Sequence, residues 1–188
     1  MLERQRAVFV LAVGLMVLLG ASAAWATVAR ALALRELVQH SELVAAGTPL
    51  EAYSRWEDFG GRRRIITYTR VRVDRLVTGT DLGPEVLVRT LGGEVGDVGQ
   101  VVEGEAILVV GKPSLLFLAP GYDGVLGVTA MAQGQFPLRP DAHGTLRLAP
   151  SPRLPQLVAG SGAPAQQVLV GHTLPEAGQL IEDAAHAK

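Results

Sequence analysis

The sequence contains no cysteine in its 188 residues. That absence excludes a disulfide framework, a thiol nucleophile and a zinc site built on thiolates. Aromatic residues make up only 5% of the chain, so the core must be built mainly from Val, Leu, Ile and Ala. The formal net charge is −1, so nucleic acid is not expected as a partner. The length predicts one domain, which must be stabilised by its packing alone.

The first 26 residues have the three parts of a bacterial-type export signal. Arg4 and Arg6 precede an uncharged stretch over residues 7–20, and the sequence AWA at residues 24–26 fits the A-x-A cleavage pattern. We therefore expect residues 1–26 to be a signal peptide and the mature protein to be exported to the periplasm or the medium. The alternative is an uncleaved anchor, because the uncharged run continues to Ala29 and is long enough to span a bilayer.

Residues 27–149 predict a β-rich domain that begins with a helix over residues 28–40. The clearest strand runs over residues 62–77, where one parity carries mostly apolar and threonine side chains and the other carries charged ones. This period of two is typical of an antiparallel sheet with one dry and one wet face. Short apolar runs separated by turns follow, with a glycine-rich loop over 92–104 and strands at 106–110 and 115–119. The pattern predicts a mainly β fold, an OB-like barrel or a small sandwich.

The composition of the chain changes from residue 150 onward. Residues 150–172 are rich in Pro, Gly, Ser and Ala, which is typical of a linker. Thr173 and Glu176 then have the spacing of a capping box, and an apolar stripe follows them. We predict a short C-terminal helix over residues 173–188.

The predicted β-rich domain contains several short motifs of apolar residues and glycines: Ser41–Gly47, Thr69–Gly79, Gly92-Gly93, Leu116–Leu118 and Gln133–Phe136. Together these motifs resemble small secreted bacterial domains of unknown function and, more distantly, the netrin-like, TIMP-type OB barrel. The resemblance implies an OB-like fold over roughly residues 35–140, and it suggests a secreted protease as a partner. Inhibition through a cysteine-anchored N-terminus does not carry over, because the chain has no cysteine, and Thr78 stands where those domains have lysine.

Arginine is the sharpest local feature, with six arginines in residues 62–75. Arg64, Arg70 and Arg72 share strand parity, so they are expected to form a row on the wet face, with Tyr68 between them and Trp56 joining them across the hairpin. Such a row could grip an anionic polymer or an acidic protein surface. The alternative is a solvated face whose arginines pair with Glu51, Glu57 or Asp58.

No catalytic residue, metal ligand or cofactor is expected. The four histidines lack metal-ligand spacing. A calcium site is a minor alternative, built from the carboxylates of Glu94, Asp97, Glu103 and Glu105 in or beside the glycine-rich loop.

These observations favour a non-enzymatic exported binding or accessory domain that recognises another exported protein. The first alternative is binding of anionic envelope polysaccharide or lipid head groups through the arginine row. The second is a hydrolase whose site is assembled from distant Asp, Glu and His residues. Contact with a membrane is expected only through residues 1–26, if that segment is kept.

Overall fold

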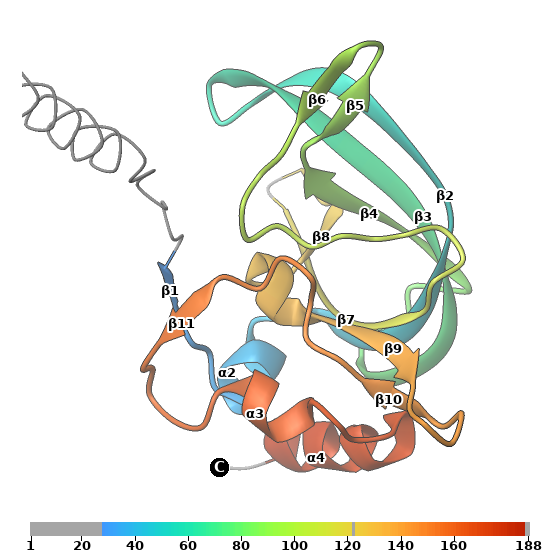
Figure 1. The fold of residues 1–188 in the computed structure, drawn as a ribbon, viewed down its shortest axis with the longest axis vertical. Helices are drawn as coiled ribbons and strands as arrows, with labels where there is room; N and C mark the ends of the chain where they lie inside the picture. The colour runs from blue at the N-terminus through green and yellow to red at the C-terminus, as the bar shows by residue number, and fades with distance from the viewer. Residues whose placement is uncertain (1–27, 122, 187–188) are drawn as a thin grey trace, which may run out of the picture.

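The computed structural model describes residues 28–121 and 123–186, and its fold is mainly β (Figure 1). The predicted signal segment therefore lies outside the described residues. The elements are β1 (Val28–Arg30), α2 (Leu34–Gln39), β2 (Leu43–Phe59), β3 (Arg62–Gly79), β4 (Glu85–Leu91), β5 (Gly93–Val95), β6 (Val98–Gln100), β7 (Ser114–Pro120), β8 (Leu126–Val128), the 3-10 helix η1 (Met131–Gly134), β9 (Gln135–Pro140), β10 (Leu146–Leu148), β11 (Gln156–Val158), α3 (Ala165–Leu169) and α4 (Leu174–His186).

The main sheet has seven strands in the order β10-β9-β7-β2-β3-β4-β8. Strand β8 pairs in parallel with β4 and also antiparallel with β7, so the sheet curls back toward itself. Both pairings are short, and the sheet is barrel-like but not closed. The sequence prediction of a mainly β fold with a helix before and a helix after the sheet is confirmed at this level.

Strands β2 and β3 form a long hairpin that dominates the molecule. Their turn is Gly60-Gly61, whose φ values of 60° and 73° suit the left-handed conformation that a two-residue hairpin turn needs. Register shifts near Val44, Gly47 and Pro49 bend β2. At Gly47 a side chain would not fit, because a Cβ there would lie 2.6 Å from Val71 Cγ1.

The core has two parts, one on each side of the curved sheet. The first lies between the sheet and the three helices, which gather at one end of the molecule (Figure 1), and its largest fully buried members are Leu37, Leu115, Phe117, Phe136, Leu148, Leu169 and Ile181. The second lies inside the curve of the sheet and consists of Leu43, Ala45, Val71, Val86, Val88, Leu116, Leu118 and Leu126. Aliphatic side chains therefore supply most of the packing.

The start of the described chain differs from the predicted helix over residues 28–40. Residues 28–30 form β1, which pairs in parallel with β11, and the helix α2 covers only Leu34–Gln39. Glu36 accepts a hydrogen bond from the backbone N–H of Ala33 at 3.1 Å and so fixes the start of α2. The helix prediction is wrong for the first six residues, because pairing with a distant strand replaces a local helical turn.

Residues 150–172, predicted to be a linker, also belong to the packed fold. They contain β11 and α3, and Ala165 and Leu169 of α3 are buried in the helix-side core. The Ser151 hydroxyl is buried and hydrogen bonds Gln135 at 2.8 Å. Proline and glycine here shape turns of a packed segment instead of a flexible connection.

Two local predictions in the middle of the chain are also corrected, and one at the end is confirmed. The expected loop over 92–104 contains the small hairpin β5–β6, whereas residues 106–110, expected to be a strand, are not in one. The predicted C-terminal helix is present as α4, and Glu176 accepts hydrogen bonds from the N–H and hydroxyl of Thr173 at 2.8 and 2.9 Å. In the described part of the chain, no helix has the length and apolar character needed to cross a membrane.

Candidate functional site: the β2–β3 hairpin

The predicted site residues lie on the β2–β3 hairpin but not on one face. Arg64, Tyr68, Arg70 and Arg72 share a face of β3, as their parity predicted. Trp56 lies opposite Ile65 in the register, so its side chain belongs to the other face. The expectation that Trp56 joins the arginine row is therefore wrong.

Arg70 is held by two carboxylates. Its Nε donates to Glu51 at 2.9 Å on β2, and its Nη1 donates to Glu85 at 2.8 Å on β4. These hydrogen bonds raise the pKa of Arg70, and the bond from Arg70 lowers the pKa of Glu51. Arg72 donates to Asp74 on its own strand at 2.7 Å. Arg70 and Arg72, two of the three arginines of the row, are thus charge-balanced, as in the solvated-face alternative.

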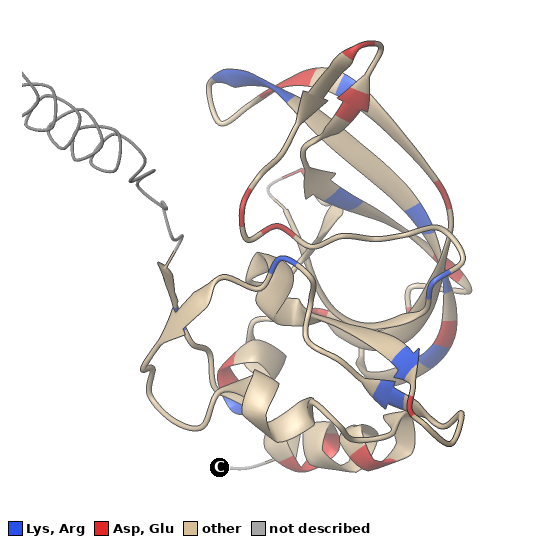
Figure 2. Cartoon of the chain, in the orientation of Figure 1, with Lys and Arg blue, Asp and Glu red and all other residues tan. Residues whose placement is uncertain are grey.

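Figure 2 shows the same balance along the hairpin, where basic and acidic segments alternate on both strands. The excess of positive charge lies just after the Gly60-Gly61 turn, where Arg62, Arg63 and Arg64 follow one another. Arg64 is half-buried, and within the described residues its Nε has no hydrogen-bond partner. The basic character therefore concentrates at the tip of the hairpin.

Tyr68 forms the centre of an ordered aromatic group on the arginine face. Its ring stacks on Tyr53 with centroids 5.5 Å apart, and its hydroxyl donates to both carboxylate oxygens of Glu57 at 2.9 and 3.0 Å. The guanidinium of Arg55 lies 4.9 Å from the ring centroid and pairs with Glu57. Tyr68 is buried by these contacts, whereas Tyr53 is 50% exposed. The stacking contact with Tyr68 therefore holds the exposed ring of Tyr53 in a fixed orientation.

Trp56 gives the opposite face of the hairpin a second exposed aromatic ring. It is 38% exposed, and the guanidinium of Arg63 lies 5.5 Å from its ring. A guanidinium over an aromatic ring is attracted by the negative face of the ring. Each face of the hairpin thus carries one exposed aromatic side chain and one arginine–aromatic contact. The exposed ring is Tyr53 on the arginine face and Trp56 on the other face.

A third arginine–aromatic contact anchors the hairpin tip to the sheet. Arg89 of β4 is buried, lies 4.8 Å from the ring of Phe59, and forms an ion pair with Asp123. Burial opposes the charge of Arg89, but the bond to Asp123 keeps its pKa above the ordinary value. The same bond lowers the pKa of Asp123. Arg89 and Phe59 thus hold the tip in place.

Sequence reasoning missed Tyr53, Arg55, Phe59, Arg63 and Arg89 as members of this surface. The signal for Tyr53 was present, because counting outward from the Gly60-Gly61 turn places it opposite Tyr68. Arg89 had no local signal, since its place depends on the pairing of β3 with β4.

The four carboxylates that could have formed a calcium site, those of Glu94, Asp97, Glu103 and Glu105, do not cluster around a common point. Over residues 28–121 and 123–186, no group of three His, Cys, Asp or Glu side chains is placed to hold a metal ion. Glu105 is instead buried and accepts hydrogen bonds from the backbone N–H groups of Leu91 at 3.1 Å and Ala106 at 2.9 Å.

Comparison with known proteins gives no family: no family model matches the chain, and no curated protein matches it. The contacts of the hairpin are ion pairs, ring stacking and arginine–aromatic contacts, which fix the orientation of side chains.

Proposed function

We propose that this protein is a non-enzymatic, exported binding module that recognises another exported protein through the β2–β3 hairpin. The observation that supports the proposal best is the exposure of aromatic rings there in a chain that has few. Tyr53 is 50% exposed and Trp56 is 38% exposed, although only 5% of the chain is aromatic. Tyrosine, tryptophan and arginine dominate the binding energy of protein interfaces.

The order of the hairpin also favours binding. Tyr53 is stacked on Tyr68, and Tyr68 is tied to Glu57, so the exposed ring loses little freedom when a partner covers it. Binding energy is otherwise lost to the immobilisation of side chains. Arg63 beside Trp56 adds a cation that can meet a carboxylate of the partner.

The alternative partner is an anionic envelope polymer or lipid head group. The contacts of Arg70 and Arg72 with Glu51, Glu85 and Asp74 favour a protein partner over this alternative. A polyanion would have to compete with carboxylates already bound to these arginines. The three arginines at the tip remain the positions through which a polymer would bind.

The test is capture of partners from the protein's own culture fluid and periplasm, at about 50 and about 200 mM salt, followed by titration with the purified partner. The variant removes both exposed rings, as Tyr53→Ser with Trp56→Ser. The matched control is Leu146→Ser, which removes a side chain that is 48% exposed on β10. A third variant, Arg70→Glu with Arg72→Glu, tests the arginine row.

We expect a saturable protein partner at both salt concentrations. Loss of the two rings should weaken the affinity for this partner by roughly 30-fold or more, as for a hot-spot residue that contributes about 2 kcal/mol. The Leu146 control should bind normally. A ligand that is lost steeply at higher salt and in the arginine variant would support the polymer instead. The absence of any saturable partner would contradict the binding-module proposal.

A further inference from the structure

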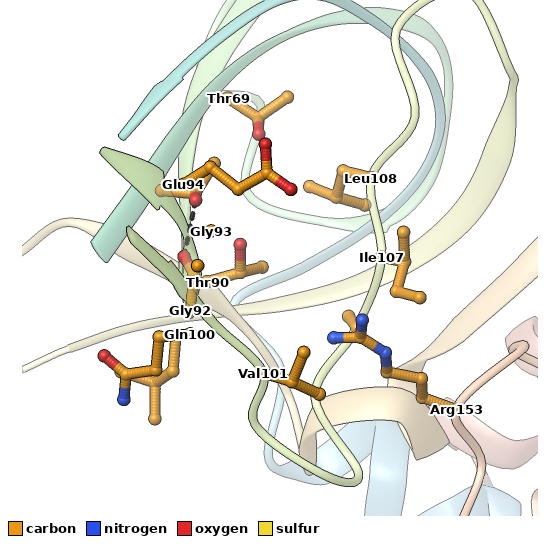
Figure 3. Close-up of a pocket in the computed structure, with 14 residues that line it drawn as sticks. Thr69, Thr90, Gly92, Gly93, Glu94, Gln100, Val101, Ile107, Leu108 and Arg153 are labelled. Atoms are coloured by element: carbon orange, nitrogen blue, oxygen red, sulfur yellow. Dashed lines mark hydrogen bonds between the residues drawn. The ribbon is translucent and has the colours of Figure 1, made fainter. Parts of the chain in front are cut away.

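A cavity of about 220 Å³ lies on the inner side of the sheet, away from the arginine face of β3. It is formed by β3, β4, the β5–β6 hairpin, the segment that follows this hairpin, and Arg153 from the segment before β11. Figure 3 shows these parts around one space. Strand β3, the stretch from Thr90 to Leu108 and the distant Arg153 thus meet at a single site.

The floor of the cavity carries a hydroxyl that lacks a partner. Thr69 is 1% exposed, and within the described residues its Oγ1 makes no hydrogen bond. Its neighbour on the same face, Thr67, donates to the carbonyl of Gly92 at 2.6 Å and is also bonded to Ser54 at 2.8 Å. A buried hydroxyl without a partner costs free energy, and a bound polar group would remove that cost.

Two opposite charges face the cavity from different walls. In Figure 3 the carboxylate of Glu94 extends over the cavity from β5, and the guanidinium of Arg153 extends into it from the other side. Within the described residues neither side chain forms an ion pair. Glu105 lies close enough to Arg153 to feel its charge, but its oxygens are occupied by backbone N–H groups.

The rest of the cavity wall is apolar and consists of the side chains of Leu91, Val101, Ala106, Ile107 and Leu108. The volume is below the roughly 300 Å³ at which pockets for drug-sized molecules begin. The cavity therefore fits a small molecule with a cationic end, an anionic end and a short apolar part.

We propose that this cavity binds a free aliphatic amino acid as a zwitterion. The ammonium group pairs with Glu94, the carboxylate pairs with Arg153, and Thr69 Oγ1 completes a hydrogen bond at the floor. The aliphatic side chain lies against the apolar wall. A net-neutral ligand that carries both charges can pair with both side chains, whereas a simple anion or cation would leave one of them unpaired. The proposal is independent of the hairpin surface and its partner.

The test is isothermal titration of the protein, expressed with its native leader and purified as the cell processes it. The probes are L-valine and L-leucine. N-acetyl-leucine, which lacks the cationic end, and leucinamide, which lacks the anionic end, are the controls. We expect one saturable site for at least one amino acid and about tenfold or greater weakening for each blocked compound. No saturable binding of either amino acid up to about 10 mM would overturn the proposal.

Variants assign the ends of the ligand. Arg153→Gln should remove the preference for leucine over leucinamide, and Glu94→Gln should remove the preference over N-acetyl-leucine. Thr69→Val should weaken both amino acids without changing either preference. Arg139→Gln, which removes an exposed arginine on β9, is the matched control and should bind as the parent does. Binding that is equal for blocked and free amino acids, or unchanged in both charge variants, would place the ligand elsewhere and refute the assignment.

Discussion

The C-terminal helix should be part of the cooperative core, and Ile181→Ala tests this. Ile181 of α4 is fully buried, in the same cluster as Leu37 of α2, Phe117 of β7 and Leu169 of α3. Removing three buried carbons loses their transfer free energy and leaves a cavity among side chains from four elements. Because such a site cannot collapse easily, we expect the free energy of unfolding to fall by about 3 kcal/mol, within the usual 2–5 kcal/mol for Ile→Ala.

The measurement is urea unfolding followed by far-ultraviolet circular dichroism. In a thermal melt followed by the same signal, a loss of about 3 kcal/mol should lower Tm by about 6–12 °C in a domain of this size. The slope with urea should be unchanged, since the variant alters stability and not the surface exposed on unfolding. Gln179→Ala, an exposed position on the same helix, is the control and should change stability by less than about 0.5 kcal/mol.

The result that would refute this reasoning is a loss below about 1 kcal/mol for Ile181→Ala at an unchanged slope. Helix α4 would then dock without contributing to the cooperative unit. An early, separate transition in the unfolding curve would lead to the same conclusion, because it would show the helix leaving before the sheet unfolds.

Two further predictions concern the cavity region. Gly93→Ala should lower the free energy of unfolding by about 1–3 kcal/mol more than Gly96→Ala in the same urea assay. A Cβ at residue 93 would lie 2.2 Å from Thr67 Oγ1, whereas a Cβ at residue 96 would have no atom within 4 Å. Equal losses for the two variants would contradict the close packing at residue 93. Burial raises the pKa of Glu105 above its ordinary value of 4.5, so the folded state binds the proton more tightly and stability should fall as pH rises above about 4.5. Glu105→Gln should remove this fall between about pH 4.5 and 8, and an identical pH profile in the variant would show that Glu105 does not cause it.

The fold class could be predicted because the signals for it are local. The alternation in β3 and the Gly60-Gly61 turn identify the hairpin, and the Thr173–Glu176 capping box identifies the start of α4. Period-two patterns, turn glycines and caps depend on neighbours in sequence, so they are readable without a structure.

The errors occurred where long-range pairing decides the structure. Residues 28–30 are a strand only because residues 156–158 lie beside them. The proline-rich segment that contains β11 has the composition of a linker, yet Leu169 at its end is fully buried in the helix-side core. Composition measures local flexibility and says nothing about distant contacts that fix a segment.

The candidate site was predicted in part. The alternative in which Arg70 pairs with Glu51 is present in the structure, but Glu85 as its second partner depends on the pairing of β3 with β4. The position of Trp56 could have been obtained from the sequence, because a two-residue turn fixes which residues face each other. What could not be obtained is the cavity, since Thr69, Glu94 and Arg153 come together only in the folded sheet.

The two proposed sites can be tested separately because neither Tyr53 nor Trp56 lines the cavity, although Trp56 lies on the same face of the hairpin as Thr69. Tyr68 and Thr69 are consecutive in β3, but Tyr68 packs against Tyr53 on the arginine face while Thr69 lines the cavity on the other. Substitutions at exposed rings of the hairpin therefore leave the cavity wall intact, and Thr69→Val leaves the stacked rings in contact. If amino acid binding nevertheless changed when the partner was bound, β3 itself would be the physical link, since it contributes backbone to both sites.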